Sequence, residues 1–341
     1  MTTQLDASIG IKEETTYGTP VTVDRFVEFL SESLDVASSW STGAGMRVGS
    51  RMSRADRRIL TQTGAAGSIG MEAPTKGLGL WLKAVLGSVT TTLVETGVYQ
   101  QVHTPLTTDP INSFTIQKGV PPIGGGSTHA MTMPGMVCKS LELSAKAGDP
   151  VEISTEWIGA EVRTNIAYAA PSYPSNLDIL SFVHGAIVLG GTLTAPTTTA
   201  LASSTASAAA NVMDVKVKIE SGIDDGGRAL GGAGAITRKP VLGRVAVTGE
   251  MTIEYTDNVL RDASLAGTEL AMVLTFTHPD LIGATAKPVL QIVVPVVVFE
   301  SKIPAAGTGA AVSTSMSFSA LDGTVASAPV YVVYRSLDTT P

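Results

Sequence analysis

Cysteine is almost absent from this chain, since Cys138 is the only one among 341 residues. No intrachain disulfide is possible, which suits assembly in a reducing cytoplasm. Charged residues make up only 16% and aromatic residues 5%. The net charge is −7 and the pI about 5.2, whereas a protein that grips nucleic acid tightly is normally basic. Tight nucleic-acid binding is therefore not expected.

Long apolar runs are also missing. The longest, VLQIVVPVVVF at 289–299, is interrupted by Gln291 and Pro295 and is shorter than the about 20 apolar residues of a membrane-spanning helix. The first ten residues, MTTQLDASIG, have neither the basic nor the apolar region of a signal peptide. We therefore expect no membrane segment and a cytoplasmic location before any assembly.

Motifs of known chemistry are absent as well. The sequence has no G-x-x-x-x-G-K-[ST] phosphate loop and no G-x-S-x-G nucleophile elbow. The four histidines are far apart in sequence, outside any H-E-x-x-H or C-x-x-C pattern, and each is expected to be an ordinary surface or capped histidine: His103, His129, His184 and His278. We predict no catalytic residue, no metal site and no cofactor, so an enzyme is the weakest hypothesis.

The chain is instead rich in short alternating segments. Hydrophobic residues make up 44% and there are 35 glycines, which fits many strands joined by tight turns. At 214–221, Val215, Val217 and Ile219 alternate with polar residues, as in an antiparallel strand with one wet face. Similar patterns predict strands at 27–36, 67–73, 113–119, 139–145, 150–159, 244–255, 291–301, 312–321 and 329–336. The fold class is therefore mainly β.

Only two short helices are predicted, at 75–87 and 257–267. In the first, apolar residues follow helical spacing and Gly87 ends the pattern. The second begins with Asp257 and Asn258, which are good N-caps, and ends at Gly267. Two long loops are expected, the Arg-rich segment 41–64 and the low-complexity Thr/Ala/Ser segment 190–211.

The order of these elements repeats. Each half has a strand, an Arg- and Gly-containing loop, a second strand and a short helix that ends at glycine. Gly67 and Glu72 match Gly249 and Glu254 with the same spacing. We predict a first half at 1–189, which includes an N-terminal arm at 1–25, then an insertion or linker at 190–211, and a second half at 212–341.

Several segments resemble one known family. The opening GIKEETTYGTPVTVDRFVEFLSESLD, the segment GLGLWLKAVLGSVTTT, NSFTIQKGV, and GRVAVTGEMTIEY followed by VVPVVVFES and FSALDG are similar to the major tail tube proteins of tailed, siphovirus-like bacteriophages. The resemblance covers nearly the whole chain. It implies a β-sandwich or barrel fold with short flanking helices, here internally duplicated.

The resemblance also implies a function as a structural virion protein. Such subunits form rings that stack helically into the tube through which the genome is delivered into the host, after assembly in the host cytoplasm. A duplicated fold favours rings of three chains with pseudo-sixfold symmetry over six chains. The implied partners are further copies of this chain, the tail tip or baseplate, the tail terminator and the tape measure protein, while viral DNA passes without specific binding.

Two groups of residues are candidates for contacts between subunits or rings. The N-terminal arm is polar and unfit for a private core, so it is expected to lie on a neighbour, although a frayed terminus is also common; its candidates are Glu13, Glu14 and Tyr17. The second group is the arginines of the 41–64 loop, which suit interface ion pairs: Arg47, Arg51, Arg54, Arg57 and Arg58. A solvated loop and a nucleic-acid site are the alternatives for this group.

An acidic lumen is the last expectation. Carboxylates on the wet faces of strands would repel DNA phosphates and leave the genome free to slide, and the alternative is that they are simply solvated. The candidates are Glu28, Glu32, Glu72, Glu220, Glu250 and Glu254. Two rival functions remain open: another ring-forming viral tail or capsid protein, and a soluble β-sandwich binding module.

Overall fold

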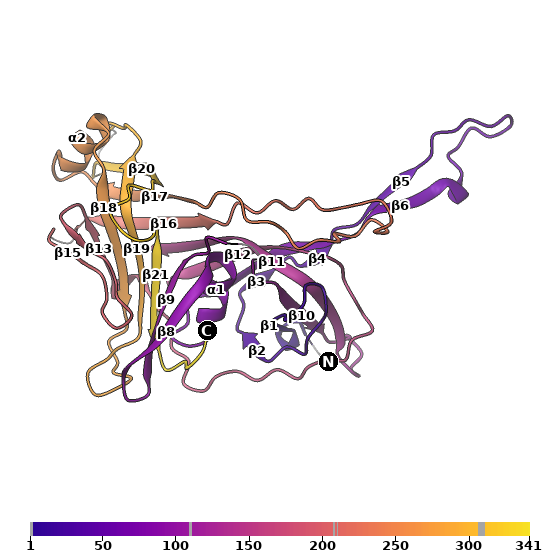
Figure 1. Ribbon diagram of the computed structural model, residues 1–341, viewed down its shortest axis with the longest axis horizontal. Helices are drawn as coiled ribbons and strands as arrows, with labels where there is room; N and C mark the ends of the chain where they lie inside the picture. The colour runs from indigo at the N-terminus through magenta and orange to yellow at the C-terminus, as the bar shows by residue number, and fades with distance from the viewer. Residues whose placement is uncertain (1–2, 109–110, 207–208, 210, 306–310) are drawn as a thin grey trace.

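The computed structural model describes residues 3–108, 111–206, 209, 211–305 and 311–341 (Figure 1). The described chain is mainly antiparallel β, as predicted, with two α-helices, α1 (Gly79–Leu86) and α2 (Val259–Ala266). Both helices lie inside the ranges predicted from sequence, and both are followed by glycine with a positive φ, Gly87 and Gly267. Neither α-helix in the described ranges is long and apolar enough to cross a bilayer.

One layer of the fold is a continuous antiparallel sheet. Its strands lie in the order β3 (Ser31–Glu32) with β4 (Asp35–Val36), β7 (Ala65–Glu72), β12 (Glu152–Gly159), β11 (His129–Lys146), β16 (Val212–Glu220), β17 (Ala246–Glu254) and β20 (Ser313–Ala320). The long β11 reaches beyond this layer. There it pairs with β10 (Phe114–Val120), which is followed by β1 (Ser8–Glu13) and β2 (Arg25–Val27).

The second layer crosses the first at a steep angle (Figure 1). Its strands lie in the order β8 (Gly87–Glu95), β9 (Val98–Pro105), β21 (Tyr331–Ser336), β19 (Val289–Phe299), β18 (Leu270–Thr277) and β13 (Gly185–Leu189). The end of β19 also pairs with β20, so the two layers are hydrogen-bonded to each other at this corner.

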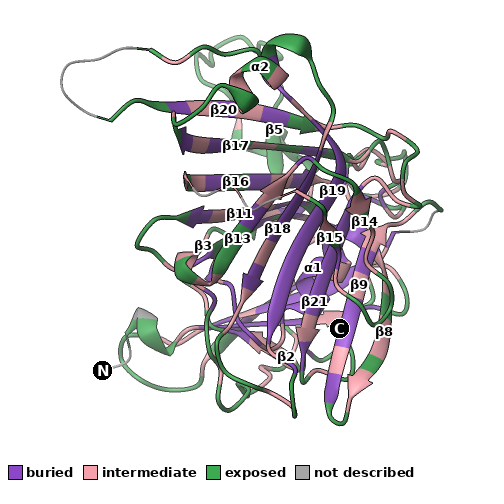
Figure 2. Cartoon of the chain, turned by 90° about the vertical axis from the view of Figure 1, so that its left-hand side faces the viewer, coloured by how far each residue is buried: buried purple, intermediate pink, exposed green. Residues whose placement is uncertain are grey.

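The core follows from the alternation of the strands. Ile69 and Met71 of β7 are fully buried, whereas Glu72 beside them is partly exposed. Trp157 of β12 is also buried and makes edge-on contacts with Trp81 of α1 and Phe114 of β10, with ring centroids 5.7 and 5.9 Å apart. Figure 2 shows the same contrast, with β19 buried along most of its length and β17 alternating.

Strand pairing follows the same scheme in the two halves. The correspondences are β1 with β13, β3–β4 with β16, β7 with β17, α1 with α2, β10 with β18, β11 with β19 and β12 with β20. In this scheme β13 (Gly185–Leu189) groups with the second set of strands, although it lies within 1–189, the range predicted for the first half. The registers agree as well. The chain of opposed residues Gly67, Trp157 and Cys138 in the first half corresponds to Gly249, Phe318 and Phe299 in the second.

The N-terminal arm differs from expectation. Residues 8–13 form β1, in which Ile9 and Ile11 are buried, and both edges of β1 are paired, one with β10 and the other with β2. The prediction that the arm cannot bury itself in its own domain is therefore wrong for β1. The two isoleucines alternate with Gly10 and form the apolar face of β1. The charged residues that follow them made the whole segment look polar in the sequence.

The two predicted long loops contain short strands. Residues 41–64 belong largely to a hairpin of β5 (Ser39–Thr42) and β6 (Arg58–Gln62), with the one-turn helix η2 (Ala55–Arg57) before β6. In the Thr/Ala/Ser segment, β14 (Leu193–Thr194) pairs with β15 (Ser203–Ser204). Two further one-turn helices are η1 (Gln4–Asp6) and η3 (Phe182–His184).

Candidate functional site: a polar sheet face, a projecting hairpin and open sheet edges

The first layer has one polar face that runs across six strands. The side chains on this face alternate with the buried ones, as at Glu250, between Gly249 and the core residue Met251. Cross-strand partners on it are polar too, for example Glu142 opposite both Ser154 and Lys218, and Lys216 opposite Glu250. Serines cover the end of the face on β20, at Ser313, Ser315, Ser317 and Ser319.

Carboxylates outnumber cations on this polar face. Its glutamates are Glu72, Glu142, Glu152, Glu156, Glu220, Glu250 and Glu254, and its lysines on β11 and β16 are Lys139, Lys146, Lys216 and Lys218, of which Lys139 is 3.8 Å from Glu156. Lys218 is 2.6 Å from Glu220, and the hydrogen bond to that carboxylate raises the pKa of Lys218. The polar face thus keeps a net negative charge even with its lysines protonated.

The structure brings together four of the six glutamates that the sequence predicted to share a face: Glu72, Glu220, Glu250 and Glu254. Glu32 is on the other face. It lies opposite the core residue Ile69 and forms an ion pair with Lys118 at 2.5 Å. The prediction that Glu32 shares a face with the other glutamates was wrong, because the register of β3 on β7 turns its side chain away from the polar face. Glu28 is exposed just after β2 and lines a hollow with Glu72.

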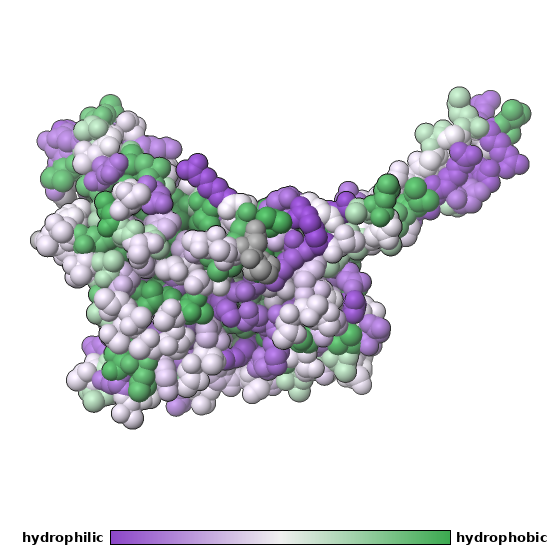
Figure 3. All heavy atoms as spheres, viewed as in Figure 1, coloured by the Kyte–Doolittle hydropathy of each residue, from purple (hydrophilic) through white to green (hydrophobic). Residues whose placement is uncertain are grey.

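The β5–β6 hairpin projects far from the two layers (Figure 1), and Figure 3 shows hydrophobic and hydrophilic residues side by side along it. Its large apolar side chains are exposed, with Met46 and Val48 fully so, and with Trp40, Met52 and Ile59 at least half exposed. Exposed apolar patches of this kind mark interaction surfaces, because a free monomer gains nothing from them.

All five predicted arginines lie on this hairpin: Arg47, Arg51, Arg54, Arg57 and Arg58. Arg54 forms an ion pair with Asp56, and the guanidinium of Arg58 lies 4.7 Å from the ring centre of Trp40. Arg57 approaches Gly45 across the hairpin. Arg47, Arg51, Arg54 and Arg58 recur at intervals of three and four residues, but this spacing does not reflect a helix, since the described residues 43–54 are extended or in turns.

Two of the three N-terminal candidates, Glu13 and Glu14, have polar partners within their own chain, whereas the buried hydroxyl of Tyr17 has no hydrogen-bond partner among the described residues. Glu13 forms an ion pair with Lys83 of α1 at 2.6 Å. Glu14 is only 8% exposed, and its carboxylate accepts hydrogen bonds from two backbone N–H groups and one hydroxyl, those of Gly18, Gly135 and Thr115, at 2.8–2.9 Å. Burial, reinforced by Glu14, raises the pKa of Tyr17 to about 12. These residues therefore anchor the N-terminal segment to β10 and α1.

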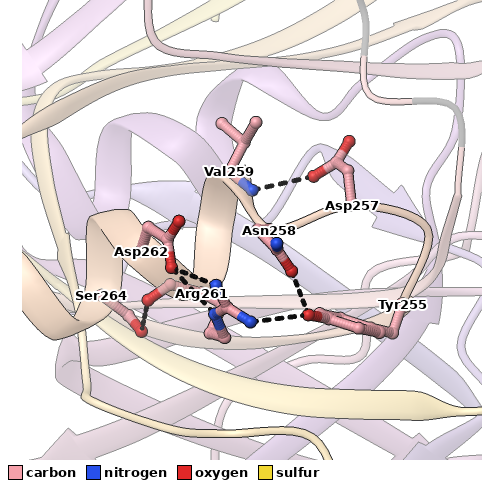
Figure 4. A network of polar contacts seen from close by, with 7 residues as sticks. All are labelled: Tyr255, Asp257, Asn258, Val259, Arg261, Asp262 and Ser264. Carbon is pink, nitrogen blue, oxygen red and sulfur yellow. Dashed lines mark hydrogen bonds and ion pairs between the residues drawn. The ribbon is translucent and has the colours of Figure 1, made fainter.

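The two matched helices differ in burial. Seven residues of α1 are buried, whereas only Ser264 of α2 is. Polar contacts hold α2 at its start (Figure 4): Asp257 accepts the N–H of Val259 at 3.0 Å, and Arg261 donates to the hydroxyl of Tyr255 at 2.9 Å. Val259 and Leu265 remain exposed on the helix surface.

The first layer ends in two edges with unpaired backbone. At one end, β3 and β4 pair only with β7, and the N–H groups of Leu34 and Val36 bond to the carboxylates of Glu32 and Asp35. At the other end, β19 leaves β20 after Phe299, and no strand is present in residues 300–305. Sheet edges of this kind are templates for pairing with another chain.

The expectation that each histidine is an ordinary surface or capped residue is wrong for His103, which is fully buried. The rings of His184 and His278 are in contact, with centroids 4.9 Å apart. His103 is completely buried under α1 and has no hydrogen-bond partner among the described residues, and desolvation, followed by the charge of Lys83, lowers its pKa to about 3. Sequence separation gave no signal for either arrangement, because strand pairing joins distant residues.

The comparisons with known proteins agree with this architecture. A search of curated proteins gave no significant match. A family model described as phage tail tube protein matches residues 4–330, nearly the whole chain. Proteins of that family are structural components of the virion tail and assemble with copies of themselves and with other tail proteins. This chain, with its layered antiparallel fold and its open edges, belongs to the phage tail tube protein family.

Proposed function

We propose that this chain polymerises as stacked rings into the tail tube that conducts the viral genome, with no enzymatic activity. The observation that carries the proposal is the negatively charged polar face of a sheet that is open at both ends. A sheet of this form is completed when copies join edge to edge into a barrel, which removes its exposed edges. The polar face would then line the lumen.

The repeated pairing scheme supports a ring of three chains. Each half supplies one strand set of the same order and register, so three chains supply six. Within one chain the halves are joined where β16, the leading strand of the second half, lies on β11 of the first. Since β3–β4 corresponds to β16 and β19 corresponds to β11, the same joint between two chains would pair β3–β4 of one copy with the residues that follow β19 in the next.

The first residue after β19 already continues the pairing that such a joint needs. The N–H of Glu300 donates to the carbonyl of Ser317 at 2.9 Å, which extends the pairing of β19 with β20 by one step. In the first half, β11 continues along β12 in the same way and so offers its far edge to β16. We infer that the segment after Phe299 becomes a strand when the neighbouring copy pairs with it.

The acidic lumen is a part of this proposal. The glutamates of the polar face would repel DNA phosphates, so the genome slides instead of binding. Glu72, Glu220, Glu250 and Glu254 would contribute directly. Glu28 lies near Glu72 at the margin of this face, whereas Glu32 would not face the lumen.

The projecting hairpin is proposed to contact a neighbouring subunit or ring. It combines exposed apolar side chains, such as Met46 and Met52, with five arginines. Arginine suits interface ion pairs, and the carboxylate-rich surface of another copy supplies partners. Tail tip or baseplate, terminator and tape measure proteins are the further partners we propose, with assembly in the host cytoplasm.

Negative-stain electron microscopy of the purified protein tests the proposal, with Val36→Pro as the informative variant. The N–H of Val36 does not bond to β7, so proline there leaves the pairing within the chain but removes a donor at the open edge. Val36→Ala is the matched control.

We expect tubes or stacked rings with threefold averages and six similar lobes from the native chain and from Val36→Ala, and monomers from Val36→Pro. True sixfold averages would overturn the ring of three. Closed rings that never lengthen would favour a terminator or capsid protein, and a native chain that stays monomeric even with tail tip complexes present would favour a binding module.

A further inference from the structure

Four potential metal ligands converge beside the junction of the two halves. Asp178 and His184 lie in the segment that follows β12, with His184 at the end of η3. His278 directly follows β18, and Asp280 lies in the connection from β18 to β19. The isolated bridge between Pro74 and Ile179 and the pairing of β13 with β18 bring these two segments together.

The distances are close to those of a metal site. One donor atom from each of Asp178, His278 and Asp280 lies within 4.8 Å of the others. Nδ1 of His278 accepts the backbone N–H of Asp280 at 3.3 Å, which leaves Nε2 as the available donor atom of this ring. The ring of His184 lies edge-on to that of His278, with centroids 4.9 Å apart, next to the three donors.

The local structure holds these donors in place. The backbone of Asp178 exchanges hydrogen bonds with Thr75, since its carbonyl accepts the N–H of Thr75 at 2.8 Å and its own N–H donates to the Thr75 hydroxyl at 3.3 Å. Nδ1 of His184 accepts the N–H of Ser181 at 3.2 Å, which orients the ring and leaves Nε2 as its available donor atom. Asp178 is therefore anchored through its backbone and His184 through Nδ1 of its ring.

The charge balance of the cluster also favours a cation. In the described ranges, no lysine or arginine lies within ion-pair distance of Asp178 or Asp280, and the contact of Asp280 is with His278. Two carboxylates beside two imidazoles thus lack a permanent positive partner. A divalent ion would supply one.

We propose that Asp178, His184, His278 and Asp280 bind one divalent transition-metal ion, with zinc as the best match. Imidazole nitrogen and carboxylate oxygen are both zinc donors, and a tetrahedral site with bonds of about 2.0–2.2 Å places its donors about 3.3–3.6 Å apart. The three measured donors need to close by about 1 Å, which the side chain of Asp280, 76% exposed, can do by rotation. Calcium and magnesium prefer all-oxygen sites and fit this donor set less well.

The bound ion would clamp the connecting segment to the β18–β19 loop. Asp178 is tied to the first half through Thr75, whereas His278 continues β18 of the second half. A ligand that binds only the folded chain raises its melting temperature in proportion to the logarithm of ligand concentration. The clamp does not depend on tube formation, so the site can be tested on the native chain and on the Val36→Pro protein alike.

Zinc titration by calorimetry on chelator-treated protein tests the site, together with the visible absorption of the cobalt(II) form. We expect one zinc per chain with a Kd of about 10 µM or tighter, tetrahedral cobalt bands, and a melting temperature that rises with zinc and falls back with chelator. Asp280→Asn and His278→Asn should each weaken binding at least about tenfold. His129→Asn, which changes a histidine outside the cluster, should bind as the parent does.

Two results would overturn the proposal. One is the absence of zinc binding by the parent protein at millimolar zinc. The other is equal affinity in the parent, His278→Asn and Asp280→Asn, which would assign the zinc to adventitious surface groups. Since Asp280 is exposed, its variant reports on binding without a threat to folding.

Discussion

The burial of His103 leads us to predict that the free energy of unfolding falls in acid. The residue lies on β9, is 0% exposed, and neither ring nitrogen has a hydrogen-bond partner in the structure as described. Burial, aided by the nearby charge of Lys83, lowers its pKa from 6.5 to about 3. The folded chain therefore keeps this imidazole neutral at a pH at which the unfolded chain protonates it.

The sign and size of the effect follow from proton linkage. Below pH 6.5 the unfolded state binds one more proton than the folded state, so the free energy of unfolding falls as the pH falls. The loss is about 1.36 kcal/mol per pH unit and amounts to about 2 kcal/mol at pH 5. It stops growing once the pH passes the folded pKa of about 3.

The assay is urea denaturation between pH 7.5 and 5 of the Val36→Pro protein, which we expect to be monomeric, with and without His103→Leu. Leucine removes the titrating group and two buried, unpaired polar atoms, each of which costs ~1–3 kcal/mol. We expect the parent to lose about 2 kcal/mol more than the His103→Leu variant over this range, and the variant to be at least as stable at pH 7.5. Equal pH dependence in the two proteins would refute the reasoning. His129→Leu serves as the exposed control.

Three further predictions concern anchoring, the lumen and the hairpin. Glu14→Ala leaves two N–H groups and a hydroxyl without their acceptor and should lower the free energy of unfolding by about 3 kcal/mol, as measured by denaturation; a loss below about 1 kcal/mol would contradict its anchoring role. Glu72→Lys with Glu254→Lys should leave tubes intact but slow DNA delivery in an infection assay, and undiminished infectivity would argue against the acidic lumen. Replacing Arg47, Arg51 and Arg54 by Gln should make tubes dissociate at lower salt in sedimentation, because interface ion pairs are lost; unchanged salt resistance would remove the hairpin from the interface.

Much of the fold could be predicted from local sequence. Alternation at 214–221 and 244–255 specified β16 and β17 and even which side chains face the core, because a strand has a fixed period of two. The glycines after α1 and α2 marked both helix ends, since only residues that tolerate a positive φ fit there. The repeat was visible because matched glycines and glutamates keep their spacing.

Other features could not be predicted from local sequence, since they depend on partners distant along the chain. Glu32 alternates like a lumen residue, but its register on β7 turns it toward Lys118. Glu14 was predicted to contact a neighbouring subunit, yet the turn at Gly135 and the strand β10 of its own chain supply hydrogen-bond donors to it. Local pattern carries no information on which distant strand lies opposite.

The sequence by itself determined the β class, the helix positions and the family of this protein, because these depend on short-range periodicity and on segment order. Only the tertiary structure decided that β1 is a buried strand, that the Arg-rich segment is a projecting hairpin, and that His184 and His278 meet. The physical reason is that register and burial are set by pairing across residues far apart in sequence, where one step of register exchanges the two faces of a strand.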